Sequence, residues 1–171
     1  VVREADELGG EDTGSETAHP DPRVLIIGGG HCGQALCAMS AALGFDRWVH
    51  DARSDAELGA DFVGATRLQG GMDTLVHAFD SARVVNAVLL NRDFAADVEA
   101  LCVLAGRPLA YLGMMGSRRR IQAVLAALAP ERRDALAALQ APVGIDIGAQ
   151  TPAEIAVSIL AQLIATRHGA D

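Results

Sequence analysis

The sequence predicts a single α/β domain with a doubly wound parallel sheet of the Rossmann type, and the first strand at its centre. Three observations predict this fold class. The chain has 171 residues, half of them apolar, which is enough for one core and too few for two ordinary domains. From residue 23 onward, short β-branched runs alternate with segments of helical period. The first run enters a glycine loop that opens a helix. Such alternation produces parallel strands covered by helices on both faces.

Six short apolar runs are predicted to form the strands, and the segments between them have the spacing of helices. The predicted strands cover residues 23–28, 47–51, 61–66, 84–90, 109–114 and 143–148. The predicted helices cover residues 32–43, 72–81, 94–105, 118–129, 131–139 and 152–167.

The last helix has the clearest start signal. Thr151 is the predicted N-cap, Pro152 takes the first helical position, and Glu154 completes a capping box. The body of this helix is apolar almost all round, which predicts burial against the sheet or in a homodimer interface.

Residues 1–22 form an acidic segment that precedes the predicted domain of residues 23–171. This segment holds seven acidic residues and one arginine, and it is rich in Gly, Ser, Thr and Pro. Too little apolar surface is present to offset the entropy of ordering it. We therefore interpret it as a flexible tail or an interdomain linker.

Composition excludes several classes of function. The net charge of −8 and the lack of a basic patch argue against nucleic acid as a partner. No apolar run reaches the roughly 18 residues of a membrane span, and the first residues do not resemble a signal peptide. The three cysteines lack paired spacing, so we expect a reducing, cytoplasmic environment. The chain has no lysine, which excludes Schiff-base chemistry and a Walker lysine, and no metal-ligating cluster is expected.

The glycine loop after the first strand predicts a phosphate site. Gly28 permits a tight turn, Gly30 lets backbone amides approach a pyrophosphate, and Gly33 allows the helix to pack closely on the strand. Gly29 belongs to the same loop. The second strand ends at Asp51, 18 residues after Gly33, where a dinucleotide fold places the acid that binds ribose hydroxyls.

Three further residues near this loop have open interpretations. Arg53 weakens the preference that Asp51 creates for a ribose without a 2′-phosphate. His31 is either a hydrogen-bond donor to phosphate, a proton carrier or a solvated loop residue. Cys32 is either a thiol activated by the helix N-terminus or a small packing residue. We include all three among the predicted binding residues.

A second turn with anion-binding character follows the fifth strand. Gly116 and Ser117 precede a helix whose first turn carries Arg118, Arg119 and Arg120. Arginines at a helix start oppose the macrodipole, so either an anion binds there or the arginines form a solvated basic patch or salt bridges to Asp and Glu. Asp146, between two glycines of a later loop, either faces a ligand or forms an Asx turn.

Three motifs resemble one protein family. These are IIGGGHCGQAL after the first strand, YLGMMGSRRR after the fifth, and APVGIDIGAQTPAEIAVSILAQLIATR near the end. Together they resemble the C-terminal Rossmann domain of the XdhC/CoxI family of xanthine dehydrogenase accessory proteins, over roughly residues 23–168.

The resemblance implies an accessory role rather than catalysis. Such proteins bind the molybdenum cofactor, as molybdopterin or its dinucleotide, protect it during sulfuration and deliver it to a molybdenum hydroxylase apoenzyme. A cofactor sulfurase is the second implied partner. Family members often carry a Thr-His-Asp-like run after the fourth strand, where this chain has Asn91, Arg92 and Asp93.

Two other functions compete with this interpretation. The first is a fragment of an NAD-dependent oxidoreductase, although the chain after the sixth predicted strand leaves no room for a substrate domain. The second is a regulatory module that senses NAD or an adenine nucleotide. We therefore expect the glycine loop to bind the molybdenum cofactor or NAD. We expect the chain to act as a chaperone rather than as an enzyme.

Overall fold

The computed structural model describes residues 20–169 of the chain. Most of the predicted acidic tail, residues 1–19, lies outside the described residues. Within the described part, no helix is both long and apolar enough to cross a membrane.

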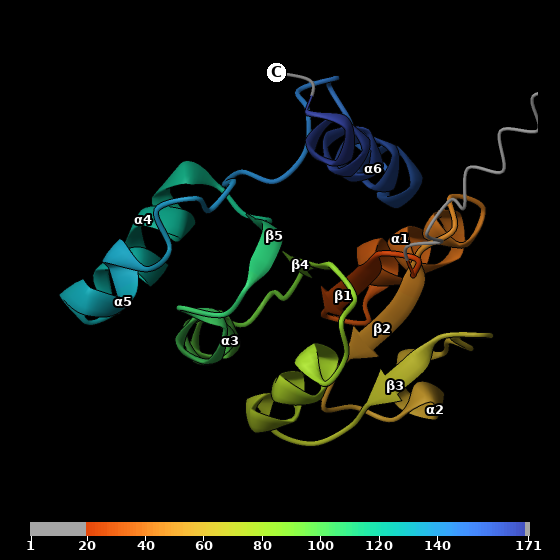
Figure 1. Cartoon of the computed structure of the whole chain (residues 1–171), viewed down its shortest axis with the longest axis horizontal. Coiled ribbons are helices and arrows are strands. Elements are labelled where there is room, and N and C mark those ends of the chain that lie inside the picture. Colours follow the sequence, from red (N-terminus) through yellow and green to blue (C-terminus); the bar gives the residue numbers. More distant parts are fainter. Residues whose placement is uncertain (1–19, 170–171) are drawn as a thin grey trace, which may run out of the picture.

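A five-stranded sheet forms the centre of the molecule, and every strand pair in it is parallel. Its strands are β1 (Arg23–Ile27), β2 (Asp46–His50), β3 (Thr66–Leu68), β4 (Val85–Leu89) and β5 (Leu109–Met114). They lie in the order β3-β2-β1-β4-β5, so the first strand is central, as predicted (Figure 1). The predicted fold class, a doubly wound α/β sheet of the Rossmann type, is confirmed.

Helices cover both faces of this sheet (Figure 1). On one face α1 (His31–Ala41) packs beside α6 (Pro152–His168). On the other face α3 (Phe94–Leu104) packs beside a 3-10 helix, η1 (Met72–Phe79). The remaining helices are α2 (Asp55–Leu58), α4 (Arg118–Ala126) and α5 (Pro130–Asp134).

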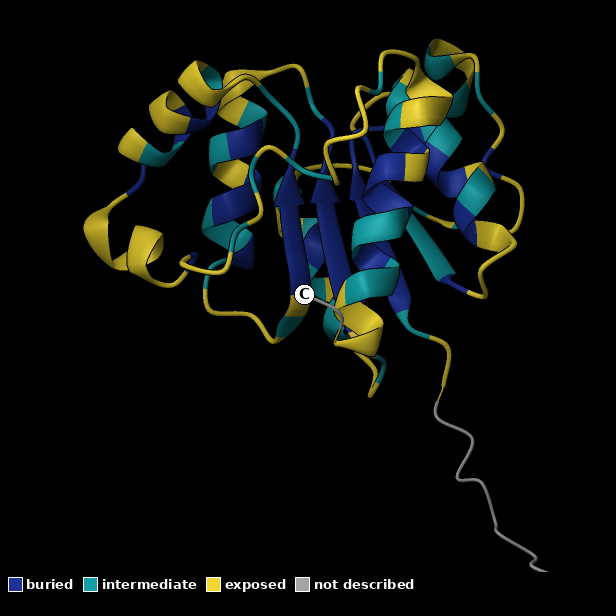
Figure 2. Cartoon of the chain, turned by 90° about the horizontal axis from the view of Figure 1, so that it is seen from above, coloured by how far each residue is buried: buried dark blue, intermediate teal, exposed yellow. Residues whose placement is uncertain are grey.

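Alternation along each strand divides the core into two layers. The central strands are buried along their length (Figure 2). On β1, Leu25 and Ile27 face the layer under α3 and η1, whereas Val24 and Ile26 face the layer under α1 and α6. All four side chains are fully buried. Burial on both faces explains why the central strands are continuous apolar runs.

The predicted capping box of the last helix is present. The Thr151 hydroxyl accepts from the amide of Glu154, whose carboxylate accepts in turn from the Thr151 amide. Ala156, Ile159 and Leu163 are buried in the layer shared with α1. Packing within the chain therefore accounts for the apolar face of α6.

Two predicted strands are wrong. Residues 61–66 form a turn at Gly64, which has a positive φ of +73°, and the strand β3 starts only at Thr66. Phe62 is buried as a loop residue, which made this run resemble a strand. Residues 143–148 are irregular, because Gly144 and Gly148 both adopt positive φ values.

The helices differ from their predicted bounds mainly at their C-terminal ends. Helix α4 ends at Ala126, and α5 is a short helix that covers only residues 130–134 of the segment after it. Helix α2 was not predicted, although Ser54 and Glu57 form a capping box at its start.

The single tryptophan lies on β2 among charged neighbours. The guanidinium carbon of Arg23 lies 4.1 Å from the centre of the Trp48 ring, and Arg23 Nε donates to Asp46 Oδ2 over 2.7 Å. Trp48 Nε1 donates to the same oxygen over 3.2 Å. Arg23 is therefore buried with both its charge and its planar face satisfied.

Candidate functional site

A cavity of about 590 Å³ lies at the carboxyl ends of the central strands. Residues after β1, β2 and β4 line it, including Gly30, Asp51 and Arg92. This edge is the point where the strand order reverses, because β1 pairs with β2 on one side and β4 on the other. Open α/β sheets bind their ligands at this point, and the volume is typical of a small-molecule site.

Gly28 and Gly33 have the structural roles that the sequence predicts, whereas the phosphate-binding role of Gly30 stays a prediction. Gly28 has a φ of +115°, and a Cβ there would lie 2.8 Å from the carbonyl carbon of Leu90. A Cβ at Gly33 would collide with the Gly28 carbonyl oxygen. At Gly30, by contrast, a Cβ would meet no atom within 4 Å. Gly28 and Gly33 thus serve the packing of the loop, and Gly30 faces open space in the cavity.

The N-terminus of α1 presents free amides to this space. Gly30 is the N-cap, and neither a capping side chain nor an acidic residue in the first turn satisfies the helix start. Within residues 20–169 the N–H groups of Gly30, His31 and Cys32 donate no hydrogen bond. Unpaired amides and the positive end of the helix dipole attract an anion.

Asp51 lies next to the glycine loop and accepts four hydrogen bonds. Oδ2 accepts from the Gly29 amide at 2.8 Å and from Arg53 Nη2 at 2.9 Å. Oδ1 accepts from the Arg53 amide and from Arg53 Nε, both at 3.0 Å. Burial alone would raise the pKa of Asp51, but the hydrogen bonds from Arg53 and Gly29 outweigh it and lower the pKa to about 2.

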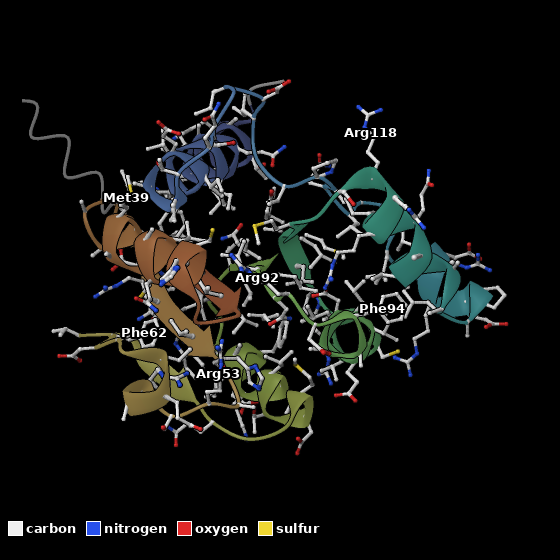
Figure 3. The ribbon with its side chains drawn as sticks, turned by 180° about the vertical axis from the view of Figure 1, so that it is seen from behind. Met39, Arg53, Phe62, Arg92, Phe94 and Arg118 are labelled. Carbon is white, nitrogen blue, oxygen red and sulfur yellow. The ribbon has the colours of Figure 1, made fainter. Side chains whose placement is uncertain are left out.

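The opposite wall of the cavity contains an arginine. Arg92, labelled in Figure 3, follows β4 and is exposed. It lines the cavity together with Asn91. Burial raises the pKa of the Cys32 thiol, and the positive charge of Arg92 opposes that rise. The net effect of burial and of this charge is a raised pKa for Cys32.

A buried network holds Arg92 and Asn91 in place. Arg120 donates to Asp97 Oδ2 over 2.6 Å and to the Arg92 carbonyl oxygen over 2.9 Å. Asn91 donates to the other oxygen of Asp97 over 3.2 Å. Asp97 is 1% exposed, so this network fixes the loop between β4 and α3 relative to α4.

His31 and His50 both line the cavity but differ in their surroundings. His31 is exposed at the start of α1. His50 is buried, and its Nε2 lies 3.1 Å from the carbonyl oxygen of Gly70. A carbonyl only accepts, so the proton resides on Nε2. Nδ1 has no hydrogen-bond partner among the described residues.

The second predicted turn lies away from this cavity. Ser117 caps α4 by accepting from the Arg120 amide, and Gly116 precedes it, but neither lines the cavity. Arg118 and Arg119 are exposed, and Arg118 points away from the molecule (Figure 3). Of the three arginines, Arg120 is the one directed toward the β4–α3 loop.

Asp146 also lies outside the cavity lining. It is exposed, and its Oδ1 accepts from the Gly148 amide over 3.3 Å. This is the Asx-turn geometry that was the alternative to ligand binding. The cavity thus brings together Gly28, Gly30, His31, Cys32, Asp51 and Arg53, whereas Gly116, Ser117, Arg118, Arg119 and Asp146 lie elsewhere.

Sequence reasoning did not assign Asn91, Arg92 and His50 to the binding site. The three residues share one feature: each lies at the end of a strand that pairs with β1, or directly after such a strand. Because the first strand was predicted to be central, the ends of both neighbouring strands could have been identified as parts of the site.

These features define a Rossmann domain with a glycine-loop cleft at its topological switch point. Comparison with known proteins identifies its family. The XdhC Rossmann domain model matches residues 24–163, so the chain belongs to this family.

Two curated relatives cover most of this chain. The first, "Uncharacterized protein YqeB" of Escherichia coli K12, is 35% identical over 158 residues, which is 87% of this chain and 28% of the relative. The second, a probable xanthine dehydrogenase subunit of Bacillus subtilis, is 30% identical over 149 residues, which is 86% of this chain and 44% of the relative. The chain spans less than half the length of either.

A solved structure has the same fold. The crystal structure of a xanthine dehydrogenase from Bacillus halodurans matches with a TM-score of 0.72 and 28% sequence identity. The match covers 88% of this chain and 45% of that chain.

Proposed function

We propose that this domain binds a phosphate-bearing ligand, either a dinucleotide such as NAD or the pyrophosphate of a pterin cofactor, at the loop between β1 and α1. The observation that carries the proposal is the set of unpaired amides at Gly30, His31 and Cys32, three residues that line the cavity. Leaving such donors without a partner is costly unless water or an anion binds them.

Charges on both sides of the cavity support a ligand with two polar ends. Arg92 adds a guanidinium next to the α1 start, where it would hold phosphate oxygens. Asp51 offers a carboxylate at the position that binds ribose in dinucleotide folds. Molybdopterin carries a phosphate and its dinucleotide carries a pyrophosphate and a ribose, so these residues fit the phosphate end of either form.

We further propose an accessory role in the maturation of a xanthine dehydrogenase-type enzyme. Membership of the XdhC family and the names of the relatives from the two Bacillus species support this role. In this accessory role, the domain binds the molybdenum cofactor and delivers it to a molybdenum hydroxylase apoenzyme. A cofactor sulfurase is the second partner. Such chemistry belongs to the cytoplasm, where the cysteines stay reduced.

Thermal unfolding in the presence of three ligand classes tests the binding proposal. NAD, cytidine nucleotides and molybdopterin are added separately to the wild-type chain and to Gly30→Val. A ligand at one hundred times its dissociation constant stabilises the wild type by about 2.7 kcal/mol. We expect no shift in the variant, whose side chain fills the phosphate space. Failure of all three ligands to shift the wild type would contradict the proposal.

A further inference from the structure

The hydrogen bonds to Asp51 divide into two kinds. Two come from backbone amides, those of Gly29 at 2.8 Å and Arg53 at 3.0 Å. The other two come from the Arg53 guanidinium, in which Nε lies 3.0 Å from Oδ1 and Nη2 lies 2.9 Å from Oδ2. A carboxylate has about four acceptor positions. Arg53 therefore occupies the two positions that the backbone leaves open.

The side chain of Arg53 is free to leave although its backbone is held. The side chain is 56% exposed, against 9% for Asp51. The Arg53 carbonyl oxygen accepts from Arg67 Nη2 over 3.1 Å, which fixes the main chain just before the capped start of α2. An ion pair with one partner in solvent is weak, because water competes for the guanidinium. Rotation of the Arg53 side chain would thus leave Asp51 in place.

We propose that the Arg53 side chain is an exchangeable cover on the ribose-binding carboxylate and sets which nucleotides the site accepts. This inference rests on the proposed nucleotide site. The 2′ and 3′ hydroxyls of a ribose are two donors, and they replace Nε and Nη2 on Asp51 one for one. The amides of Gly29 and Arg53 keep the carboxylate oriented throughout.

A ribose with a 2′-phosphate uses the same arginine differently. It offers only the 3′ hydroxyl to Asp51 and brings a negative charge next to the carboxylate, which disfavours binding. The guanidinium released from Asp51 stays at the cavity rim, on a side chain long enough to bind the phosphate oxygens. Arg53 thus competes with an unmodified ribose and supports a phosphorylated one.

Calorimetric titration with NAD and NADP tests this exchange. The proteins are the wild type, Arg53→Ala and the control Arg133→Ala, which removes the same charge from exposed helix α5. In Arg53→Ala we expect NAD to bind about threefold more tightly, since no ion pair must be broken. NADP should bind about tenfold more weakly, since the phosphate loses its partner. Arg133→Ala should leave the ratio of the two affinities unchanged.

Two results would overturn the inference. Unchanged affinities for both nucleotides in Arg53→Ala show that the arginine does not act on the site. Equal weakening of both shows that it acts only through general charge. If wild type and variants bind neither nucleotide, the inference falls, whereas the proposed phosphate site fails only if molybdopterin and cytidine nucleotides do not bind either.

A measurement without ligand separates these failures. The carboxyl carbon of Asp51, followed by NMR during acid titration, should show a higher pKa in Arg53→Ala than in the wild type. The same pKa in both proteins would mean that the cover does not form in the free protein, which also overturns the inference.

Discussion

The amide of Gly29 donates a hydrogen bond of 2.8 Å to Oδ2 of Asp51, which joins the loop after β1 to the end of β2. This one contact links the parts of the cavity that we propose to bind phosphate and ribose. Because Asp51 is held by its own neighbour Arg53 as well, the carboxylate belongs to the fold before any ligand arrives.

Asp51→Asn should destabilise the protein at neutral pH. The folded pKa of Asp51 is lowered to about 2, whereas an unfolded aspartate titrates near 3.9. Stabilisation from the charged group is therefore complete above about pH 4 and is lost as the pH falls toward 2. We expect a loss on the order of 1–2 kcal/mol at pH 7, reduced because Arg53 is half exposed. Urea unfolding at pH 7 and pH 3 measures this loss, and an equal deficit at both would contradict it.

Glycine substitutions should separate folding from binding. Gly30→Val should leave the free energy of unfolding nearly unchanged, because a Cβ there would meet no atom within 4 Å. Gly33→Ala should unfold or strongly destabilise the domain, because the new Cβ collides with the Gly28 carbonyl. Circular dichroism and thermal unfolding compare the two. A Gly30→Val protein that unfolds would show that the loop has a second packing constraint.

Arg92→Ala should weaken phosphate-bearing ligands without affecting the fold. A charge-assisted hydrogen bond lost from the cavity lowers affinity by about tenfold, or about 1.4 kcal/mol. Titration with the same ligand at low and high salt measures the loss, which should shrink as salt screens the guanidinium. A similar loss in Arg133→Ala would assign the effect to net charge instead.

Arg120→Met should reveal the cost of the buried Asp97. The pKa of Asp97 is raised by burial, and the Arg120 and Asn91 hydrogen bonds oppose that rise. Without Arg120 the carboxylate loses its charged partner, and we expect a loss of about 3 kcal/mol at pH 7. The deficit should narrow as the pH falls through the further raised folded pKa, because protonated Asp97 needs no cation.

Adding Asp97→Asn to the Arg120 variant provides the control for this pair. The double variant has no buried charge, so it should recover part of the lost stability at pH 7. If the losses in unfolding free energy of the two single variants simply add in the double variant, the ion pair is not the cause of the destabilisation.

Replacing Arg118 and Arg119 with alanine should distinguish ligands by size. Both arginines lie outside the cavity lining, so affinity for a bare nucleotide should not change. Affinity for a whole pterin cofactor should fall by tenfold or more, about 1.4 kcal/mol, if its far end reaches this turn. Calorimetry with both ligands decides. No loss for either would identify the two arginines as a solvated patch.

The central strands were predictable because burial on both faces gives a continuous apolar run. The edges of the sheet were not predictable in this way. Strand β3 has only three residues, Thr66–Leu68, and its pattern is weaker than that of the turn before it, where Phe62 is buried. At the other edge, the segment after α5 forms an isolated bridge with β5 at Gln140, and the Val143 amide donates to the Met114 carbonyl oxygen. The positive φ values of Gly144 and Gly148 then keep the following run from forming a strand.

The site was predictable where chemistry follows a local motif. Gly28, Gly30 and Gly33 match the sequence pattern of a phosphate loop, and the assignment of Asp51 follows from its spacing to that loop. Arg92 could not be found in this way, because its approach to Cys32 depends on how the β4–α3 loop is held by Arg120 from a distant helix. The coverage of Asp51 by Arg53 depends on side-chain rotamers, which spacing does not encode.

The Trp48 stack with Arg23 makes the protein its own optical probe of folding. Trp48 is the single tryptophan, so all indole emission comes from one known environment. Its ring packs against the layer under α3 and η1 and does not line the cavity. Emission will therefore change when the sheet comes apart and stay constant when a ligand enters, so one fluorescence trace reports unfolding without interference from binding.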